Sequence, residues 1–573
     1  MEYIILAGAI VLVIVLIMVK EYFSSKSYRN KVLHQIYLSY GTPAERSYKA
    51  GEMEHIGMYY HKHTAEHQID DITWNDLDLD SIYQTINVSC SAAGDEYLYY
   101  RMRTPIYDPE EMEHMESRIR YFMEHEEERH TVQRMLLDLG RMGKYSIYEY
   151  LEYLETLGER NNARYYLSNL LLLASVGVMF LSLPIGMVVL FGMLCHNIVG
   201  YYKEYKEIEP YITSFRYIDK LLRNAQQLGR RSIQGIAGEQ DRLSECYRKM
   251  KGFIRNTYLI IYTEKGNGNP LGILTDYLRM TFYLDLIQFN RALRAVRGHI
   301  SEIDEMVTLF GQIETAIVIG SYRNSLQNRY CIPVIEYERS AERRMVMEQL
   351  YHPLLADPVL NSITTERGVL ITGSNASGKS TFLRAVAVNA VLAQTIHTCL
   401  AARYEAPLMR IYSSMSLKDD LLGGQSYYMV EISSIKRILD QVKQAETDNC
   451  HVLCFVDEVL RGTNTVERIA ASTQIMRMLS TDHVLCFAAT HDMELTKLLE
   501  GEYDNYHFEE RIEEDDIFFP YILLKGPATT RNAIALLKML QYDERIVKDA
   551  ERMAEQFLES GLWQNNNRYQ DSN

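Results

Sequence analysis

Residues 373–380 read Gly373–Ser374–Asn375–Ala376–Ser377–Gly378–Lys379–Ser380, and this stretch decides the fold of the C-terminal part of the chain. It matches the pattern G-x-x-x-x-G-K-[ST] at every position. An apolar run typical of a buried strand precedes it, and a helical pattern follows it. A strand, a glycine-rich loop and a helix in this order surround a phosphate with backbone N–H groups and the positive end of the helix dipole. The stretch therefore predicts a site for a nucleoside triphosphate, ATP, bound with Mg²⁺.

The loop residues have expected roles in such a site. Lys379 would reach the β- and γ-phosphates, and the hydroxyl of Ser380 would be a ligand of Mg²⁺. The residues predicted to contact the nucleotide are Gly373, Ser374, Asn375, Ala376, Ser377, Gly378, Lys379, Ser380 and Thr381. The alternative, a glycine- and serine-rich turn with an unrelated lysine, does not explain the strand and the helix on either side.

Two later apolar runs end in polar residues. The run from Val452 ends at Asp457 and Glu458, and the run from Val484 is followed by His491. In enzymes with this loop, the first acid after such a strand orders Mg²⁺ and the second polarises the attacking water. We expect Asp457 to bind the metal together with Ser380. We expect Glu458, His491 and Lys379 to be catalytic, although a histidine in this place is by itself more often a plain loop residue.

Length and charge limit the classes of function. A chain of 573 residues is long enough for several domains. Its formal charge of −16, from 60 basic and 76 acidic residues, argues against a broad non-specific surface for nucleic acid but leaves room for a local basic groove.

Uncharged stretches predict three membrane helices. The first runs from Tyr3 to Val19 and is followed by basic residues, as in a signal anchor with its N-terminus outside. The second stretch, residues 165–202, is long enough for two helices of about eighteen residues, with a break at Leu183–Gly186. Basic residues flank it on both sides, which places both flanks in the cytoplasm. The alternative is a buried helical hairpin of a soluble core.

The rest of the chain divides by its pattern into helical and mixed regions. Residues Ile303, Met306, Val307, Phe310, Ile313 and Ile317 repeat at helical spacing and predict a helix packed on helices. Arg291, Arg294 and Arg297 share one helix face, which would contact phosphate or, more commonly, face solvent. From about residue 350, short β-rich runs alternate with helices, as in a wound α/β domain.

We therefore expect a multi-domain protein, in which a transmembrane helix precedes an all-α lever region, a transmembrane hairpin interrupts that region, and an α/β P-loop ATPase domain of the ABC type follows. The expected segments are a signal anchor at 1–20, lever parts at 21–164 and 203–345, the hairpin at 165–202, the ATPase domain at 346–535 and a helical dimerisation element with a tail at 536–573.

Four ordered motifs in residues 351–492 resemble the ATPase domain of the MutS family of DNA mismatch-repair proteins. Tyr351–His352–Pro353 resembles the family's R-H-P, and Asp419–Glu431 resembles D-D-L-x-x-G-x-S-T-F-M-x-E. Asp457–Thr465 resembles D-E-x-x-R-G-T-x-T, and Ala489–His491 matches A-T-H. Weaker likeness extends through residues 86–120 and 311–333 to the family's lever region, and residues 540–559 look like its C-terminal dimer element.

The resemblance implies a homodimer formed through the ATPase domain, in which Ser426 of each subunit contacts the nucleotide held by the other. It also implies DNA binding and a clamp that ATP binding and hydrolysis open and close. Leu460 departs from the pattern, because the family has a small residue there. The chain also has no room for the N-terminal domain with which the family reads mismatches, which makes mismatch recognition doubtful.

The function expected from the sequence is that of a Mg²⁺-dependent, MutS-like, DNA-binding ATPase, a multi-pass protein of the cell membrane with its soluble domains in the cytoplasm. One alternative is an ATP-switched membrane scaffold that binds an unknown protein partner and no DNA. Another is a subunit of an ABC-type transporter, since Leu421–Ser426 also resembles the L-S-G-G-Q signature of that class. The predicted spans carry no charged residue of the kind that marks a transport pathway.

Overall fold

The chain folds into two units in a computed structural model. The structure describes residues 20, 31–143, 145–158, 160–262, 270–338, 342–374, 377–415, 427–448, 450–460, 463–513, 516–528, 534, 537–538, 541–560 and 563. The first unit comprises residues 1–66, 83–102 and 110–327, and the second comprises residues 67–82, 103–109 and 328–573. The predicted anchor at Tyr3–Val19 lies outside the described residues.

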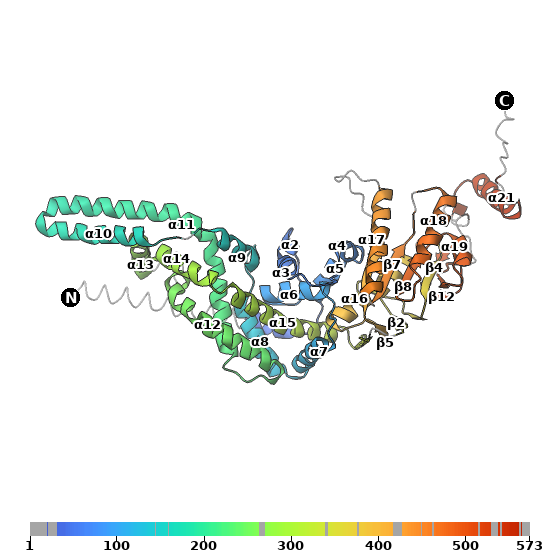
Figure 1. Ribbon diagram of the computed structural model, residues 1–573, viewed down its shortest axis with the longest axis horizontal. Helices are drawn as coiled ribbons and strands as arrows, with labels where there is room; N and C mark the ends of the chain where they lie inside the picture. The colour runs from blue at the N-terminus through green and yellow to red at the C-terminus, as the bar shows by residue number, and fades with distance from the viewer. Residues whose placement is uncertain are drawn as a thin grey trace, which may run out of the picture. The chain divides into compact units, whose positions relative to one another are not determined.

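The first unit is helical (Figure 1). Its main helices are α6 (Ala92–Arg103), α7 (Pro109–Glu124), α8 (Glu126–Leu139), α9 (Ile147–Thr156), α10 (Ala163–Leu181), α11 (Leu183–Leu228), α12 (Ala237–Tyr262), α13 (Pro270–Thr281), α14 (Leu284–Arg297) and α15 (Ile300–Ser325). The shorter α2 (Glu52–Ile56) and α3 (Met58–Lys62) precede them. The last residues of α5 (Leu79–Ile86) also belong to this unit. All six residues of the predicted apolar repeat are buried in α15, which packs against α12, α11 and α8. The predicted helix-on-helix seam is thus confirmed.

Helices α10 and α11 form a hairpin that projects from this unit (Figure 1). The turn is one residue, Ser182, so the break lies just before the predicted Leu183–Gly186, and Pro184 instead occupies the first turn of α11, where its missing N–H costs nothing. The helices cross closely at Gly186, since a Cβ there would lie 2.5 Å from the backbone of Met179. Helix α11 continues beyond residue 202, where the predicted uncharged stretch ends, because buried side chains such as Ile212 and Phe215 continue its apolar face into the body of the unit.

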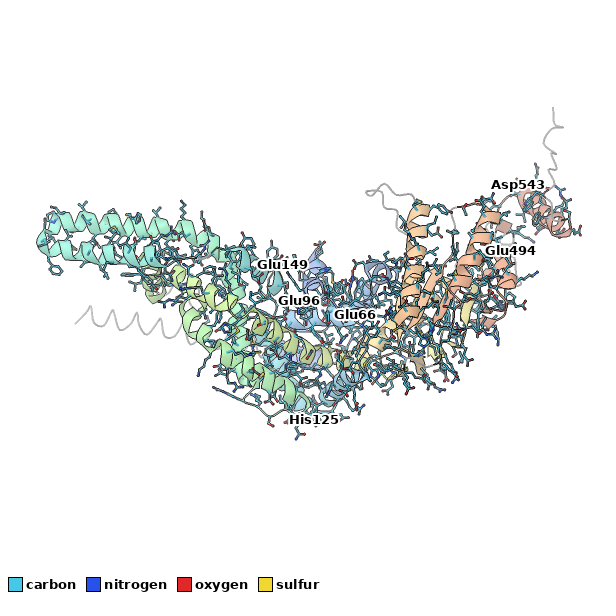
Figure 2. All side chains as sticks on the ribbon, in the orientation of Figure 1. Glu66, Glu96, His125, Glu149, Glu494 and Asp543 are labelled. Atoms are coloured by element: carbon cyan, nitrogen blue, oxygen red, sulfur yellow. The ribbon has the colours of Figure 1, made fainter. Side chains whose placement is uncertain are left out.

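Both hairpin helices are long and apolar enough to cross a membrane, by length and composition. Only 17% of the apolar window of α10 and 11% of that of α11 is buried, whereas a hairpin in a soluble core would be mostly buried. Side chains along both helices stand out from the ribbon in Figure 2. The exposed apolar residues include Phe180 and Leu181, at 87% and 88% exposure.

A buried acid lies at the centre of the helical unit. The carboxylate of Glu314 in α15 accepts hydrogen bonds from the hydroxyl of Ser91 and from the backbone N–H groups of Cys90 and Ser91. Burial raises the pKa of Glu314 to about 7, against the effect of these hydrogen bonds, and the nearby carboxylate of Asp95 raises it further. Asp95 itself is held by Arg46 and Arg141, each at 2.7 Å.

This pKa predicts a pH-dependent stability. Because the pKa of Glu314 is raised in the folded state, its contribution to stability is complete below about pH 4.5 and is lost as the pH rises to about 7. The full loss corresponds to about 3 kcal/mol. The substitution Glu314→Gln keeps an acceptor for the backbone N–H groups but cannot ionise. We expect its thermal midpoint to approach or exceed that of the unsubstituted protein at pH 8, and to fall below it at pH 5. Parallel curves for the two proteins between pH 5 and 8 would contradict this assignment.

The second unit is built on a six-stranded sheet in the order β12-β9-β4-β8-β7-β6. All neighbours are parallel except β12 and β9. A four-stranded sheet has the order β1-β5-β2-β3, and β10 and β11 form a separate pair. The strands are β1 (Val334–Glu336), β2 (Met345–Leu350), β3 (Asn361–Thr365), β4 (Gly368–Thr372), β5 (Arg403–Pro407), β6 (Met409–Ser414), β7 (His451–Asp457), β8 (Val484–Ala489), β9 (Tyr503–His507), β10 (Arg511–Glu513), β11 (Asp516–Phe518) and β12 (Leu524–Lys525).

Helices connect the parallel strands of this unit. They are α16 (Lys379–Ile396), α17 (Tyr427–Asp448), α18 (Thr465–Met478) and α19 (Met493–Leu498), with α21 (Glu544–Ser560) near the C-terminus. Strands β4, β7 and β8 are buried almost completely, as expected for a parallel sheet covered on both faces. Ile371, Asp457 and Ala489 lie in one row across the sheet, so these three strands end at the same edge.

Two short N-terminal segments also belong to the second unit. Asp76, at the end of α4 (Asp71–Asp76), accepts hydrogen bonds from the Ser413 hydroxyl at 2.7 Å and the Met415 N–H at 2.8 Å. Asp70 caps α4 through the N–H of Thr73 and forms an ion pair with Arg437 in α17. These contacts fix residues 67–82 against β6, the outermost strand on one side of the six-stranded sheet.

Candidate functional site

The glycine-rich loop connects β4 to α16, as the sequence predicts. Helix α16 begins at Lys379, so the N–H groups of its first turn point towards the loop. Gly378 has φ +104°, and a Cβ there would lie 3.0 Å from the ring of Tyr521. A residue with a side chain is strained in this conformation, so glycine is required at the point where the loop turns into the helix.

Lys379 lies inside the loop. Its Nζ donates to the carbonyl oxygens of Gly373 at 2.9 Å and Ser374 at 2.8 Å, and the residue is buried. Ser374 in turn donates from its hydroxyl to Glu510 at 2.7 Å. The hydroxyl of Ser377 is buried and has no hydrogen-bond partner among the described residues. The loop therefore holds a cation and a hydroxyl group where a phosphate would sit.

Ser380 and Asp457 meet across the sheet edge. The Ser380 hydroxyl donates to Oδ2 of Asp457 at 2.5 Å, although the residues are far apart in sequence. A hydroxyl and a carboxylate side by side are the oxygen ligands that Mg²⁺ prefers. The predicted pair of metal ligands is thus in contact.

Glu458 and His491 form a second pair at this edge. Nε2 of His491 lies 2.7 Å from Oε1 of Glu458. The backbone N–H of Glu458 donates to the carbonyl of Ala489 at 2.9 Å, which ties the turn after β7 to the end of β8. Arg468 holds the adjacent Asp492 through two hydrogen bonds, at 2.6 and 2.9 Å. The carboxylate and the imidazole are therefore positioned by the sheet and α18.

The turn after Glu458 depends on Glu431, whose role the sequence reasoning did not identify. Its buried carboxylate accepts a hydrogen bond from the N–H of Leu460. Leu460 has φ +60°, in the left-handed region that favours glycine, while its side chain is buried in the core. The family pattern has a small residue here, so burial of the leucine must offset the backbone strain.

A cavity of about 480 Å³ adjoins the loop. Gly378, Lys379, Ser380, Thr381 and Glu458 are among the residues that line it. The remaining wall is largely apolar and includes Leu350, Leu355, Val359, Phe508 and Tyr521. Such a wall suits a planar aromatic base beside the phosphates.

Most of the apolar wall was not identified from the sequence, because its residues come from several separate segments. Tyr351 and His352, from the resemblance to R-H-P, do line the cavity. Burial and the charge of Arg384 lower the pKa of His352 to about 4, so this imidazole is neutral at physiological pH. No local pattern marks Tyr521, which reaches the loop from the segment after β11.

Three predicted site residues, Asn375, Ala376 and Ser426, lie outside the described residues. The others, Gly373, Ser374, Ser377, Gly378, Lys379, Ser380, Thr381, Asp457, Glu458 and His491, all lie at or near the edge where β4, β7 and β8 end. The donor set of the loop and the Ser380–Asp457 pair fit a nucleoside triphosphate with Mg²⁺.

Comparison with known proteins gives matches in the same part of the chain. The family model described as MutS domain V matches residues 369–558. The DNA mismatch repair protein MutS of Thermus thermophilus is 34% identical over 183 residues, which is 32% of this chain and 22% of that protein. The Thermus aquaticus protein is 36% identical over the same shares. The DNA mismatch repair protein MutS 2 of Haloarcula marismortui is 34% identical over 185 residues, 31% of this chain and 19% of that protein. The chain thus matches about a fifth of the length of these relatives.

Proposed function

This chain belongs to the MutS family, and from that membership we propose that it is a membrane-tethered, Mg²⁺-dependent ATPase whose nucleotide cycle opens and closes a dimeric clamp on DNA. The observation that carries the proposal is the convergence of the Lys379 loop, the Ser380–Asp457 pair and the Glu458–His491 pair at one sheet edge. The matched relatives are named as DNA mismatch repair proteins.

Each group has a defined task in ATP hydrolysis. Lys379 would exchange its loop carbonyls for the β- and γ-phosphates, and the N–H groups of the loop would donate to the phosphate oxygens. Mg²⁺ held by Ser380 and Asp457 would neutralise charge on the phosphates. Glu458 would accept a proton from the attacking water, and His491 would orient the Glu458 carboxylate through their 2.7 Å contact.

A dimer would complete this site. By resemblance to the family, Ser426 of a second subunit would contact the γ-phosphate. Helix α21 supports such an assembly, since Ile546 and Met553, two helical turns apart, are 52% and 41% exposed. Apolar side chains exposed on one helix face suit a contact between two copies.

The exposed apolar hairpin supports the membrane tether. Its arms carry no charged residue between Tyr165 and Tyr202, and basic residues flank both ends. With the uncharged segment at Tyr3–Val19, the chain would have three membrane helices, and the basic flanks would put the two units in the cytoplasm.

DNA binding is tested by turnover and by salt dependence. We expect the full-length protein in neutral detergent to hydrolyse ATP faster with one of three DNA forms: homoduplex, mismatched duplex or branched duplex. A clamp that neutralises six phosphates should lose about a thousandfold in DNA affinity between 50 and 200 mM salt. If none of the three DNA forms changed ATP turnover, and none bound the protein, the alternative of an ATP-switched scaffold for a protein partner would be favoured.

A further inference from the structure

Helix α14 is fixed against the base of the hairpin. The side chain of Asn290 donates to Asn162 at 2.7 Å, and Asn162 donates to the carbonyl of Ile287 at 3.1 Å. The hydroxyl of Tyr201 donates to Asp285 at 2.6 Å. These contacts are buried, so α14 holds a defined position beside the start of α10 and the end of the apolar part of α11.

This docking brings the arginines of α14 to the hairpin. Arg291 is exposed and donates to the hydroxyl of Tyr166 in α10 at 2.9 Å. Arg294 lies one turn later and is also exposed. Arg297 has a different role, because it donates to the carbonyl of Leu154 at the end of α9. Of the three arginines in the sequence repeat, two are therefore on the surface and one is structural.

Further cations lie at the same level of the hairpin. Arg164 forms an ion pair with Glu204, which places these two residues opposite each other, and Arg160 forms an ion pair with Glu207 at 3.0 Å. Lys203 and Lys206 lie within one helical turn of Glu204 and are exposed. We call Lys203, Lys206, Arg291 and Arg294 the basal cations.

Arg160 and Arg164 engage Glu207 and Glu204, and a third acid, Glu209, lies three residues after Lys206. Within the described part of the chain no basal cation forms an ion pair with an acidic residue. The base thus carries an excess of positive charge on an otherwise acidic protein. Such an excess favours binding of a polyanionic surface or of several phosphate groups.

Polarity changes in a fixed order along the hairpin. The end near Phe180 and Leu181 is apolar and exposed, the tyrosines Tyr166 and Tyr202 are each 47% exposed near the base, and the basal cations follow. A lipid leaflet has the same order of hydrocarbon, interface and phosphate. A DNA duplex that contacted the cations would lie beside an apolar hairpin about 25 Å long. The polar surface of the duplex could not bury this apolar surface favourably.

We propose that the basal cations bind the phosphates of anionic phospholipids in the leaflet that the hairpin enters. The inference rests on the membrane tether of the proposed function and adds a lipid class to it. The tether would then be selective for negatively charged membrane, and the position of α14 would be fixed against that surface.

The test measures lipid binding by the full-length protein in neutral detergent. Phosphatidylglycerol and phosphatidylcholine are titrated separately, and retained lipid is quantified by native mass spectrometry. We expect preference for phosphatidylglycerol that weakens in 0.5 M salt. The double substitution Arg291→Gln with Arg294→Gln should weaken phosphatidylglycerol binding by about thirtyfold, since each cation contributes about fivefold near an anionic surface.

The matched control is Arg230→Gln with Arg231→Gln, which removes the same charge just after the C-terminal end of α11 and should leave lipid binding unchanged. Equal affinity for the two lipids, or an unchanged affinity in the Arg291 and Arg294 variant, would overturn the proposal. Loss of duplex DNA affinity in that variant, with lipid binding intact, would overturn it in favour of DNA.

A separate measurement tests the tether itself. The substitution Phe180→Trp places a fluorophore at the end of the hairpin, and brominated lipid chains should quench its added fluorescence in reconstituted vesicles. Absence of quenching would contradict the membrane tether of the proposed function, and the lipid-binding inference that rests on it. Quenching without preference for anionic lipid would overturn the inference alone.

Discussion

Replacing Lys379 with alanine is expected to abolish ATP turnover and to weaken ATP binding by about a hundredfold. The lysine is buried in the loop and donates to two backbone carbonyls, so its ammonium group is already held where phosphate oxygens would lie. Its removal leaves the loop without the charge that offsets the triphosphate. Calorimetry would measure the ATP affinity of the variant, and phosphate release would measure its turnover.

The control for Lys379→Ala is Lys497→Ala, which removes an exposed lysine on α19 of the same unit and should change neither quantity. The thermal midpoint of each variant reports whether the fold is retained. Normal turnover in a folded Lys379→Ala protein would show that the loop does not bind the triphosphate.

The substitution Glu458→Gln is expected to retain ATP affinity and to lower turnover by about a thousandfold. Glutamine has the shape of glutamate and keeps an oxygen acceptor, but it cannot take a proton from water. The metal ligands Ser380 and Asp457 are untouched, so nucleotide binding should persist. Because ATP is bound but not cleaved, the variant should accumulate as a closed dimer, measured by light scattering after size-exclusion chromatography.

Two comparisons sharpen the Glu458 test. Without ATP the variant should have the same mass as the unsubstituted protein. His491→Ala should reduce turnover less, because it removes only the contact that orients the Glu458 carboxylate. Unchanged turnover in Glu458→Gln would mean that another residue activates the water.

The sequence was sufficient to locate features that are encoded in short, contiguous patterns. The glycine-rich loop at 373–380 could be placed between a strand and a helix, because its spacing is contiguous and is readable without a structure. The same holds for the acids after β7 and for the buried face of α15, since a strand end and a helical repeat are local properties. The apolar hairpin was also readable, because two long apolar runs with a break between them are visible in the sequence.

Contacts between distant segments could not be predicted in this way. Tyr521 approaches Gly378 and Glu431 binds the N–H of Leu460, although neither residue lies in the motif that it supports. Asp76 belongs to the sheet edge of the second unit despite its place near the N-terminus. Such contacts depend on how strands and helices pack. They cannot be predicted from the sequence, because it contains many other residues that could make the same kind of contact.

Local spacing and periodicity in the sequence were enough to locate the glycine-rich loop, the acids and histidine at the strand ends, the packed face of α15 and the apolar hairpin. Only the tertiary structure decided that Ser380 meets Asp457, that Glu458 meets His491, and that Arg291 and Arg294 lie at the hairpin base while Arg297 caps α9. The physical reason is that side-chain proximity across a sheet edge or between helices is set by packing of the whole unit, which no local pattern specifies.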